Sequence, residues 1–198
     1  MVKVGFICEG ETEKIILDSE NFVSVLAENN CSLIKTINAS GNGNLLPKNI
    51  GPFIQNLKDE GAEKIFILSD LDNDQCITKT KARISAPADI IVIISLKQVE
   101  SWFLADNITL SRFFDKEIQF DFPENEADPR NALKHLFLHE TGRGIGESKP
   151  KLAKRFITEG FSVLNAANHP NCSSVKYLIG KNNRFVSVIW KKVPFIIF

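Results

Sequence analysis

The feature that most constrains this fold is the alternation of short apolar runs with longer segments of helical spacing. Three runs rich in β-branched residues, Val2 to Cys8, Ile65 to Leu68 and Ile90 to Ile94, are each followed by polar or acidic residues. Such runs are typical of strands buried on both faces of a parallel sheet. A weaker fourth run, Leu33 to Asn38, lies between the first two along the chain. The pattern predicts four strands.

Helical spacing separates these strands. Glu11 to Asn29 and Asn49 to Glu60 carry apolar residues at intervals of three and four, and Thr78 to Ala82 is expected to be a third, short helix. Strands that alternate with helices are typical of an α/β fold with a doubly wound parallel sheet. We therefore predict a Rossmann-like α/β sheet flanked by helices.

After Gln98 the pattern predicts helices only. They are expected over Val99 to Asp106, Thr109 to Phe114, Pro129 to His139, Lys151 to Gly160 and Cys172 to Gly180. A chain of 198 residues with 43% hydrophobic content supports one sizeable core. We predict an α/β core over residues 1–106 and a helical extension over residues 107–198 packed on it. The apolar segment Phe185 to Phe198 is expected to be either a further strand or a tail that docks on a partner.

Composition excludes several classes of protein. Lys and Arg total 24 and so do Asp and Glu, so no overall charge attracts nucleic acid or a membrane, and any polyanion site must be local. The four cysteines are widely separated, which argues against a disulfide framework and a structural zinc site. The first apolar run is too short for a signal peptide, and no later run could span a bilayer. We expect a cytoplasmic protein that makes no membrane contact.

Acidic residues follow two of the predicted strands. Ligands of open parallel sheets bind beyond the carboxyl ends of the strands. Glu9 follows the first run, and Asp70 and Asp72 follow the third. Two residues spaced by two on an extended segment point to the same side, and Glu9 joins them if the first and third strands are neighbours. Oxygen ligands without His or Cys favour Mg²⁺ or Mn²⁺, and such ions serve phosphoryl chemistry.

Acids at strand ends can also serve simpler roles. An acid after a strand is often a helix N-cap or a turn residue, and Asp74 fits that interpretation best, as the cap of a helix near Gln75. A calcium loop that begins at Asp70 would need Gly and Glu where the chain has Gln75 and Lys81, which excludes it. A phosphatase with Asp70 as nucleophile usually carries its Asp-x-Asp pair on the opening strand, so the position here weighs against it.

Several motifs together resemble a known family. Phe6-Ile-Cys-Glu-Gly-Glu-Thr-Glu13 resembles the opening strand and Glu-Gly motif of Toprim domains, and Ser69-Asp-Leu-Asp72 resembles their Asp-x-Asp motif. With Val99-Glu-Ser-Trp-Phe-Leu-Ala-Asp106 and Ser148-Lys-Pro-Lys151, the chain is similar to compact Toprim-like proteins related to the RloB and OLD groups. The similarity extends from Val2 to about Ile179.

The resemblance implies roles for further residues. It implies a metal-dependent nuclease centre with Glu9, Asp70 and Asp72 as ligands, with Glu100 as an additional ligand or outer acceptor. Lys149 is the cation expected to stabilise the transition-state phosphate, within a basic nucleic-acid-binding patch of Arg143, Lys151, Lys154 and Arg155; a solvated helix face is the alternative. For Glu13 there are two interpretations, a capping partner in the first turn of its helix or an outer acid near the metal, and we favour capping; for Trp102 we expect a place in the core.

The leading hypothesis is thus a Mg²⁺- or Mn²⁺-dependent phosphodiesterase that cleaves DNA or RNA. The resemblance further implies an antiphage effector controlled by an ABC- or AAA-type ATPase, and leaves open whether the chain forms a homodimer or a hetero-complex. A non-catalytic Toprim-like module that regulates an ATPase is the main alternative. An Asp-nucleophile phosphatase is the weaker one.

Overall fold

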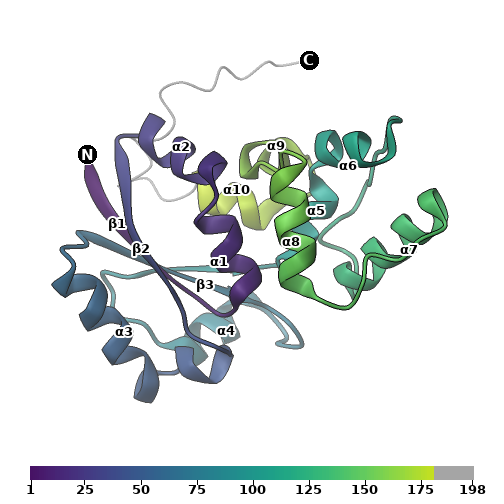
Figure 1. Cartoon of the computed structure of the whole chain (residues 1–198). Helices are drawn as coiled ribbons and strands as arrows, with labels where there is room; N and C mark the ends of the chain where they lie inside the picture. Colours follow the sequence, from purple (N-terminus) through teal and green to yellow (C-terminus); the bar gives the residue numbers. More distant parts are fainter. Residues whose placement is uncertain (181–198) are drawn as a thin grey trace.

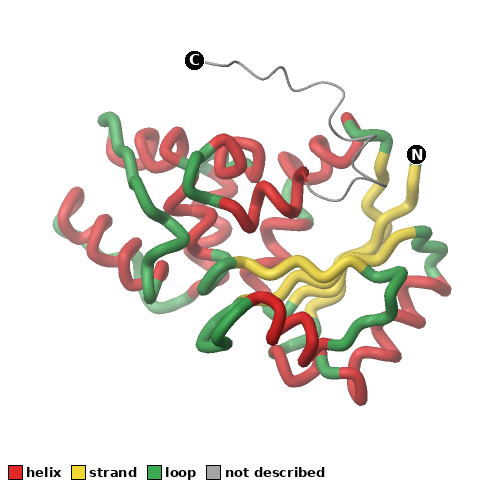
Figure 2. The backbone as a smooth tube through the Cα atoms, turned by 180° about the vertical axis from the view of Figure 1, so that it is seen from behind, coloured by secondary structure: helices red, strands yellow, loops and turns green. Residues whose placement is uncertain are grey.

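The computed structural model describes residues 1–180, and the apolar segment 185–198 lies outside the described residues. Its sheet contains β1 (Val2–Cys8), β2 (Cys31–Asn38), β3 (Lys64–Asp70) and β4 (Ile91–Ser95) in the order β2-β1-β3-β4. All three pairings are parallel. The predicted α/β class with a parallel sheet is confirmed, and the fold is Rossmann-like (Figures 1 and 2).

Helices cover both faces of the sheet because side chains alternate between its faces along each strand. Ile7 and Ile67 point toward α3 (Pro47–Asp59) and α4 (Ile77–Ile84), where they join one apolar cluster. Phe6 and Leu68 point the other way, into a larger cluster shared with the helices of the second half. The sheet is therefore the middle layer of three (Figure 1).

The first helical segment is broken, where one helix was predicted over residues 11–29. It forms α1 (Glu11–Leu17) and α2 (Glu20–Glu28), with Ser19 between them. The Ser19 hydroxyl donates to the Ile16 carbonyl at 2.7 Å and accepts from the Phe22 N–H at 3.3 Å, so one side chain ends the first helix and caps the second. A short 3₁₀ helix, Asn42–Leu45, follows β2.

The second half is helical, as predicted. Its helices are α5 (Glu100–Ala105), α6 (Asn107–Phe114), α7 (Pro129–Thr141), α8 (Lys149–Thr158), α9 (Val163–Asn168) and α10 (Ser173–Gly180). Helix α9 was not predicted, and α8 begins two residues earlier than expected because Ser148 caps it. Trp102 is fully buried in the large cluster, as expected.

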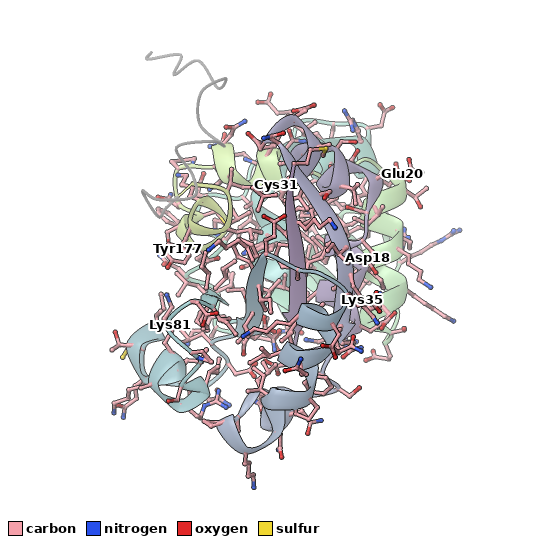
Figure 3. All side chains as sticks on the ribbon, turned by 90° about the vertical axis from the view of Figure 1, so that its left-hand side faces the viewer. Asp18, Glu20, Cys31, Lys35, Lys81 and Tyr177 are labelled. Carbon is pink, nitrogen blue, oxygen red and sulfur yellow. The ribbon has the colours of Figure 1, made fainter. Side chains whose placement is uncertain are left out.

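The two halves of the chain pack closely. Asn21 of α2 donates to the Phe161 carbonyl at 2.8 Å, and α1 lies against α8. Beyond the β4 edge, Lys81 of α4 donates to the Tyr177 hydroxyl of α10 at 3.3 Å; Figure 3 labels both residues on the same side of the molecule. No helix within residues 1–180 is long and apolar enough to cross a membrane.

Candidate active site at the switch point of the sheet

The strand order places the acidic residues at one point. Successive strands lie on opposite sides of β1, with β2 on one side and β3 on the other, so the chain leaves a crevice at the carboxyl ends of β1 and β3. Glu9 directly follows β1, and its N–H donates to the Leu68 carbonyl of β3 at 3.1 Å. Asp70 is the last residue of β3. The first and third strands are neighbours, as the grouping of Glu9 with Asp70 requires.

Asp70 is held rigidly from the neighbouring strand. Its Oδ1 accepts the Ser95 hydroxyl at the end of β4 and the Val99 N–H at 2.9 Å. The residue is 6% exposed and lines the cavity. Because both donors bind Oδ1, the described residues leave Oδ2 for a ligand.

Glu9 is held in a similar way. Its Oε2 accepts the Ser69 hydroxyl at 2.9 Å and the Asp70 N–H at 3.3 Å. Ser69 and Asp70 are successive residues of β3, so the register between β1 and β3 orients the Glu9 carboxylate. Oε1 is again left for a ligand by the described residues.

Asp72 reaches the cavity by a different route from the one expected. The extended strand ends at Asp70, and Asp72 adopts a left-handed conformation with φ of 47°. Its N–H donates to the Lys97 carbonyl at 2.8 Å, which fixes the turn. Non-glycine residues in this conformation are uncommon and tend to cluster at functional sites. The turn places Asp72 in the cavity lining.

Glu100 and Lys149 form an ion pair in the lining of the cavity. Glu100, the first residue of α5, is 1% exposed, and the Lys149 Nζ lies 3.1 Å from its Oε1. The other oxygen, Oε2, has no hydrogen-bond partner among the described residues. Both side chains line the cavity. A buried carboxylate with an unpartnered oxygen is costly unless a further cation or donor joins it.

Glu13 belongs to the site, a role that sequence reasoning did not favour. Its helix α1 has Gly10 as N-cap and shows no side-chain cap hydrogen bond, and Glu13 is 5% exposed and lines the cavity. A Cβ on Gly10 would lie 3.1 Å from Glu13 Oε2, so the glycine gives this carboxylate its space. Sequence spacing gave no signal for this role, because Glu9 lies outside α1 and the burial of Glu13 depends on how α1 packs against α8.

The cavity has a volume of about 360 Å³. It is lined by Glu9, Gly10, Glu11, Thr12, Glu13, Asn38, Ser40, Gly41, Asp70, Asp72, Glu100, Lys149 and Pro150. The four other residues of the predicted basic patch do not line it. Arg143, Lys151, Lys154 and Arg155 are exposed, and the Arg155 guanidinium lies 5.5 Å from the centres of the Phe113 and Phe137 rings.

Asp74 lies outside the cavity and is not a helix cap. Helix α4 begins at Ile77 with Cys76 as its N-cap, later than the position near Gln75 that was expected. Instead, Asp74 Oδ2 pairs with the Arg83 guanidinium, with Nη2 at 3.0 Å. Of the two acids in this loop, Asp72 thus faces the cavity, whereas Asp74 ties the loop to Arg83 of α4.

The site carries more negative charge than its own cation offsets. Burial raises the pKa of Glu9 above its ordinary value. Burial, together with the charge of Glu13, raises the pKa of Asp70 well above its usual range. Burial and the charges of Glu100 and Glu9 raise the pKa of Glu13 to about 7. Burial lowers the pKa of Lys149, but the Glu100 carboxylate outweighs this effect, so the pKa is raised overall.

The side chains present fit a hard divalent cation by their chemistry. The donor set consists of carboxylate oxygens, and Glu100 Oε2 is a buried oxygen without a partner among the described residues. The raised carboxyl pKa values indicate a site that an added positive charge would stabilise. Among residues 1–180, no group of three or more His, Cys, Asp or Glu side chains is arranged to hold a metal ion. Binding would therefore require the carboxylates to converge.

Comparisons with protein-family models, with curated proteins and with solved structures each find no match to this chain.

Proposed function

We propose that this protein is a Mg²⁺- or Mn²⁺-dependent phosphodiesterase that cleaves DNA or RNA at the cavity beyond β1 and β3. The observation that carries the proposal is the placement of Glu100, fully buried with an oxygen unpartnered among the described residues, beside Lys149 and the strand-end carboxylates in one cavity. A metal ion held by these oxygens and the ammonium of Lys149 would both offset the negative charge of a bound phosphate.

The roles of the residues follow from how each is held. Glu9, Asp70 and Asp72 would hold the metal, with Glu100 as an additional ligand; the ion would polarise the phosphate and make bound water more acidic. Ser69, Ser95 and the Val99 N–H orient Glu9 and Asp70, each through one carboxylate oxygen. Lys149 would donate to a phosphate oxygen as negative charge develops there.

The Toprim identity and the biological setting also belong to the proposal. The sheet order and the Glu-Gly and Asp-x-Asp motifs at adjacent strand ends support a Toprim-like centre. By the same resemblance, the protein is an antiphage effector controlled by an ABC- or AAA-type ATPase. Purification of the tagged protein from its native host, with its neighbouring genes intact, should recover an ATPase, and its absence would count against this part.

The test of the nuclease compares matched carboxylates. Glu9→Gln and Asp70→Asn keep the size of each side chain while removing charge, and Asp74→Asn makes the same change outside the cavity. Cleavage of duplex DNA, single-stranded DNA and RNA is assayed, and any cleavage should require Mg²⁺ or Mn²⁺. It should be lost in Glu9→Gln and Asp70→Asn and kept in Asp74→Asn. Calorimetric titration should show saturable Mn²⁺ binding to the wild type and to Asp74→Asn.

The outcomes separate the alternatives. Full cleavage by both cavity variants would refute the assignment. A chain with no saturable Mn²⁺ binding and no cleavage is instead the non-catalytic module. Hydrolysis of phosphate monoesters through a covalent aspartyl intermediate at Asp70 would establish the phosphatase.

A further inference from the structure

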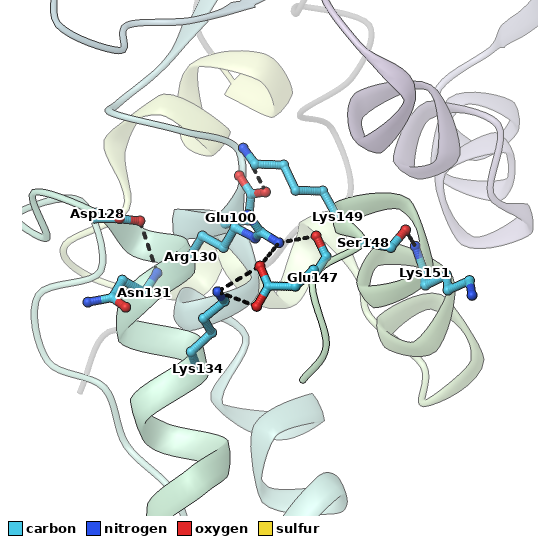
Figure 4. A network of polar contacts seen from close by, with 9 residues as sticks. All are labelled: Glu100, Asp128, Arg130, Asn131, Lys134, Glu147, Ser148, Lys149 and Lys151. Atoms are coloured by element: carbon cyan, nitrogen blue, oxygen red, sulfur yellow. Dashed lines mark hydrogen bonds and ion pairs between the residues drawn. The ribbon is translucent and has the colours of Figure 1, made fainter. Parts of the chain in front are cut away.

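A second polar network lies next to the cavity, on helix α7. Arg130 and Lys134 are four residues apart and so share one face of the helix. Both contact a single carboxylate, that of Glu147. Lys134 Nζ lies 2.9 Å and 3.0 Å from its two oxygens, and Arg130 Nη2 lies 3.5 Å from Oε2 and also donates to the Glu147 carbonyl (Figure 4).

The Glu147 carboxylate is well placed to leave these cations. It is 84% exposed, and exposed ion pairs contribute little stability. The preceding segment carries Gly142, Gly144 and Gly146, two of them with positive φ, and a Cβ on any of the three would meet nothing within 4 Å. The three glycines therefore do not pack against the rest of the described chain, whereas Ile145 between them is buried in the large apolar cluster, so the exposed Glu147 side chain and not the whole loop is what can move.

The two cations are less exposed than the carboxylate that covers them. The Arg130 side chain is 22% exposed and that of Lys134 33%, and the Arg130 Nε is buried with no hydrogen-bond partner among the described residues. A guanidinium fork and an ammonium on one helix face match the oxygens of a phosphodiester, which a carboxylate resembles in charge and geometry.

The network is linked to the cavity through the turn that leads into α8. Glu147 is two residues before Lys149, and Ser148 between them caps α8, so the covering carboxylate and the cavity cation belong to one short turn. Figure 4 shows Lys149 directed to Glu100, whereas Lys151 points away from both. A backbone phosphate bound at Arg130 and Lys134 would thus lie near Lys149 and Pro150 of the cavity lining.

We propose that Arg130 and Lys134 form a phosphodiester-binding subsite that positions a nucleic-acid strand next to the cavity, and that Glu147 occupies it until the strand displaces it. This inference rests on the proposed function for its ligand class, but it places the backbone contact on α7 and not on the exposed face of α8.

The test measures binding without cleavage. Fluorescence anisotropy of labelled DNA and RNA oligonucleotides is recorded in EDTA at several salt concentrations, with the full chain. Glu147→Gln should tighten binding about two- to fivefold, and Arg130→Gln and Lys134→Gln should each weaken it by a similar factor. Each cation variant should also reduce the slope of log affinity against log salt by about 1. Thermal unfolding verifies that each variant is folded.

Matched controls separate a local effect from a change in net charge. Glu28→Gln on α2 changes the net charge as Glu147→Gln does, and Lys48→Gln on α3 changes it as the Arg130 and Lys134 variants do. Both control residues are exposed, and both substitutions should leave the affinity for the oligonucleotide unchanged. Glu147→Gln should bring no gain in the Arg130→Gln/Lys134→Gln background. Equal effects of Glu147→Gln and Glu28→Gln, a gain that persists in that background, or no oligonucleotide binding by either the wild type or Glu147→Gln would overturn the subsite.

The two proposals fail separately. If Asp70→Asn abolishes cleavage while Glu147→Gln binds as the wild type does, the subsite is wrong and the nuclease stands. If the α7 variants change binding as stated but no cleavage is found under any metal condition, the subsite stands and the nuclease is wrong.

Discussion

The Lys149 ammonium, on the first residue of α8, lies 3.1 Å from the carboxylate of Glu100, on the first residue of α5. Two helices that begin 49 residues apart in the sequence (149 minus 100) are thereby joined at their N-terminal ends. Glu100 is 1% exposed and Lys149 is 35% exposed, so the pair is only partly shielded from water. A change at this pair is therefore expected to affect both the stability of the fold and the proposed activity.

Lys149→Gln should lower both stability and activity. It leaves the Glu100 charge buried without its cation, and we expect the free energy of unfolding to fall by about 1–2 kcal/mol, less than for a fully buried pair because solvent screens Lys149. Cleavage should fall about 100-fold or more if the ammonium stabilises the phosphate. Urea denaturation and initial cleavage rates measure the two effects.

The controls for this prediction lie on the same two helices. Lys151→Gln removes an exposed lysine two residues on and should change neither quantity. Adding Glu100→Gln to Lys149→Gln should recover stability, since both charges are then gone, but not cleavage. Full cleavage by Lys149→Gln would contradict the role assigned to this lysine.

Glu13 predicts how stability depends on pH in the absence of metal. Its pKa is about 7 in the folded chain against an ordinary value of 4.5, so the folded state binds this proton more tightly than the unfolded state does. The contribution of Glu13 to stability is therefore present below pH 4.5 and is lost as the pH rises through about 7. Thermal unfolding in EDTA across this window should show a falling transition temperature.

Glu13→Gln should flatten that profile, because the amide cannot lose a proton. Addition of Mn²⁺ should raise the transition temperature of the wild type most at the upper end of the window, where the carboxylates are charged. Glu20→Gln, an exposed change on α2, is the control. An unchanged slope in Glu13→Gln would show that other groups cause the dependence.

The position of Gly5 in β1 predicts a packing effect away from the candidate active site. A Cβ at this position would lie 2.9 Å from Cδ2 of Leu57, which is fully buried in α3. We expect Gly5→Ala to destabilise the fold by about 1–3 kcal/mol through overpacking. Leu57→Val should recover part of this loss in the double variant, and Gly43→Ala, with open space around its Cβ, should have little effect. Urea denaturation of the four variants measures these differences.

The sheet could be predicted because its strands are buried on both faces. That burial leaves runs such as Val2–Cys8 nearly free of polar residues, and such runs stand out from helical spacing. The break between α1 and α2 depends on one serine hydroxyl, and serine occurs in helices as well as at caps. The short helix α9 has too few turns for its spacing to be recognised.

The site was predictable to the extent that it depends on strand ends. Glu9 and Asp70 follow from the rule for parallel sheets, and the pairing of β1 with β3 brings them together. The burial of Glu13 and the contacts of Glu147 with α7 depend on how distant helices pack. Sequence spacing carries no signal for such contacts, so it could not single out Arg130 and Lys134.

Glu124 predicts how the loop before α7 is anchored. Its carboxylate accepts the Ser173 N–H at 2.6 Å, the Ser173 hydroxyl at 2.8 Å and the Ser174 N–H at 2.8 Å, and so satisfies the free donors at the start of α10. Glu124→Ala should cost about 1–2 kcal/mol of unfolding free energy, as the loss of a helix cap does. Urea denaturation of Glu124→Ala beside Glu117→Ala, an exposed acid of the same loop, tests this. Equal stability of the two variants would mean that water replaces the cap, whereas a loss confined to Glu124→Ala would show that this carboxylate holds the loop to α10.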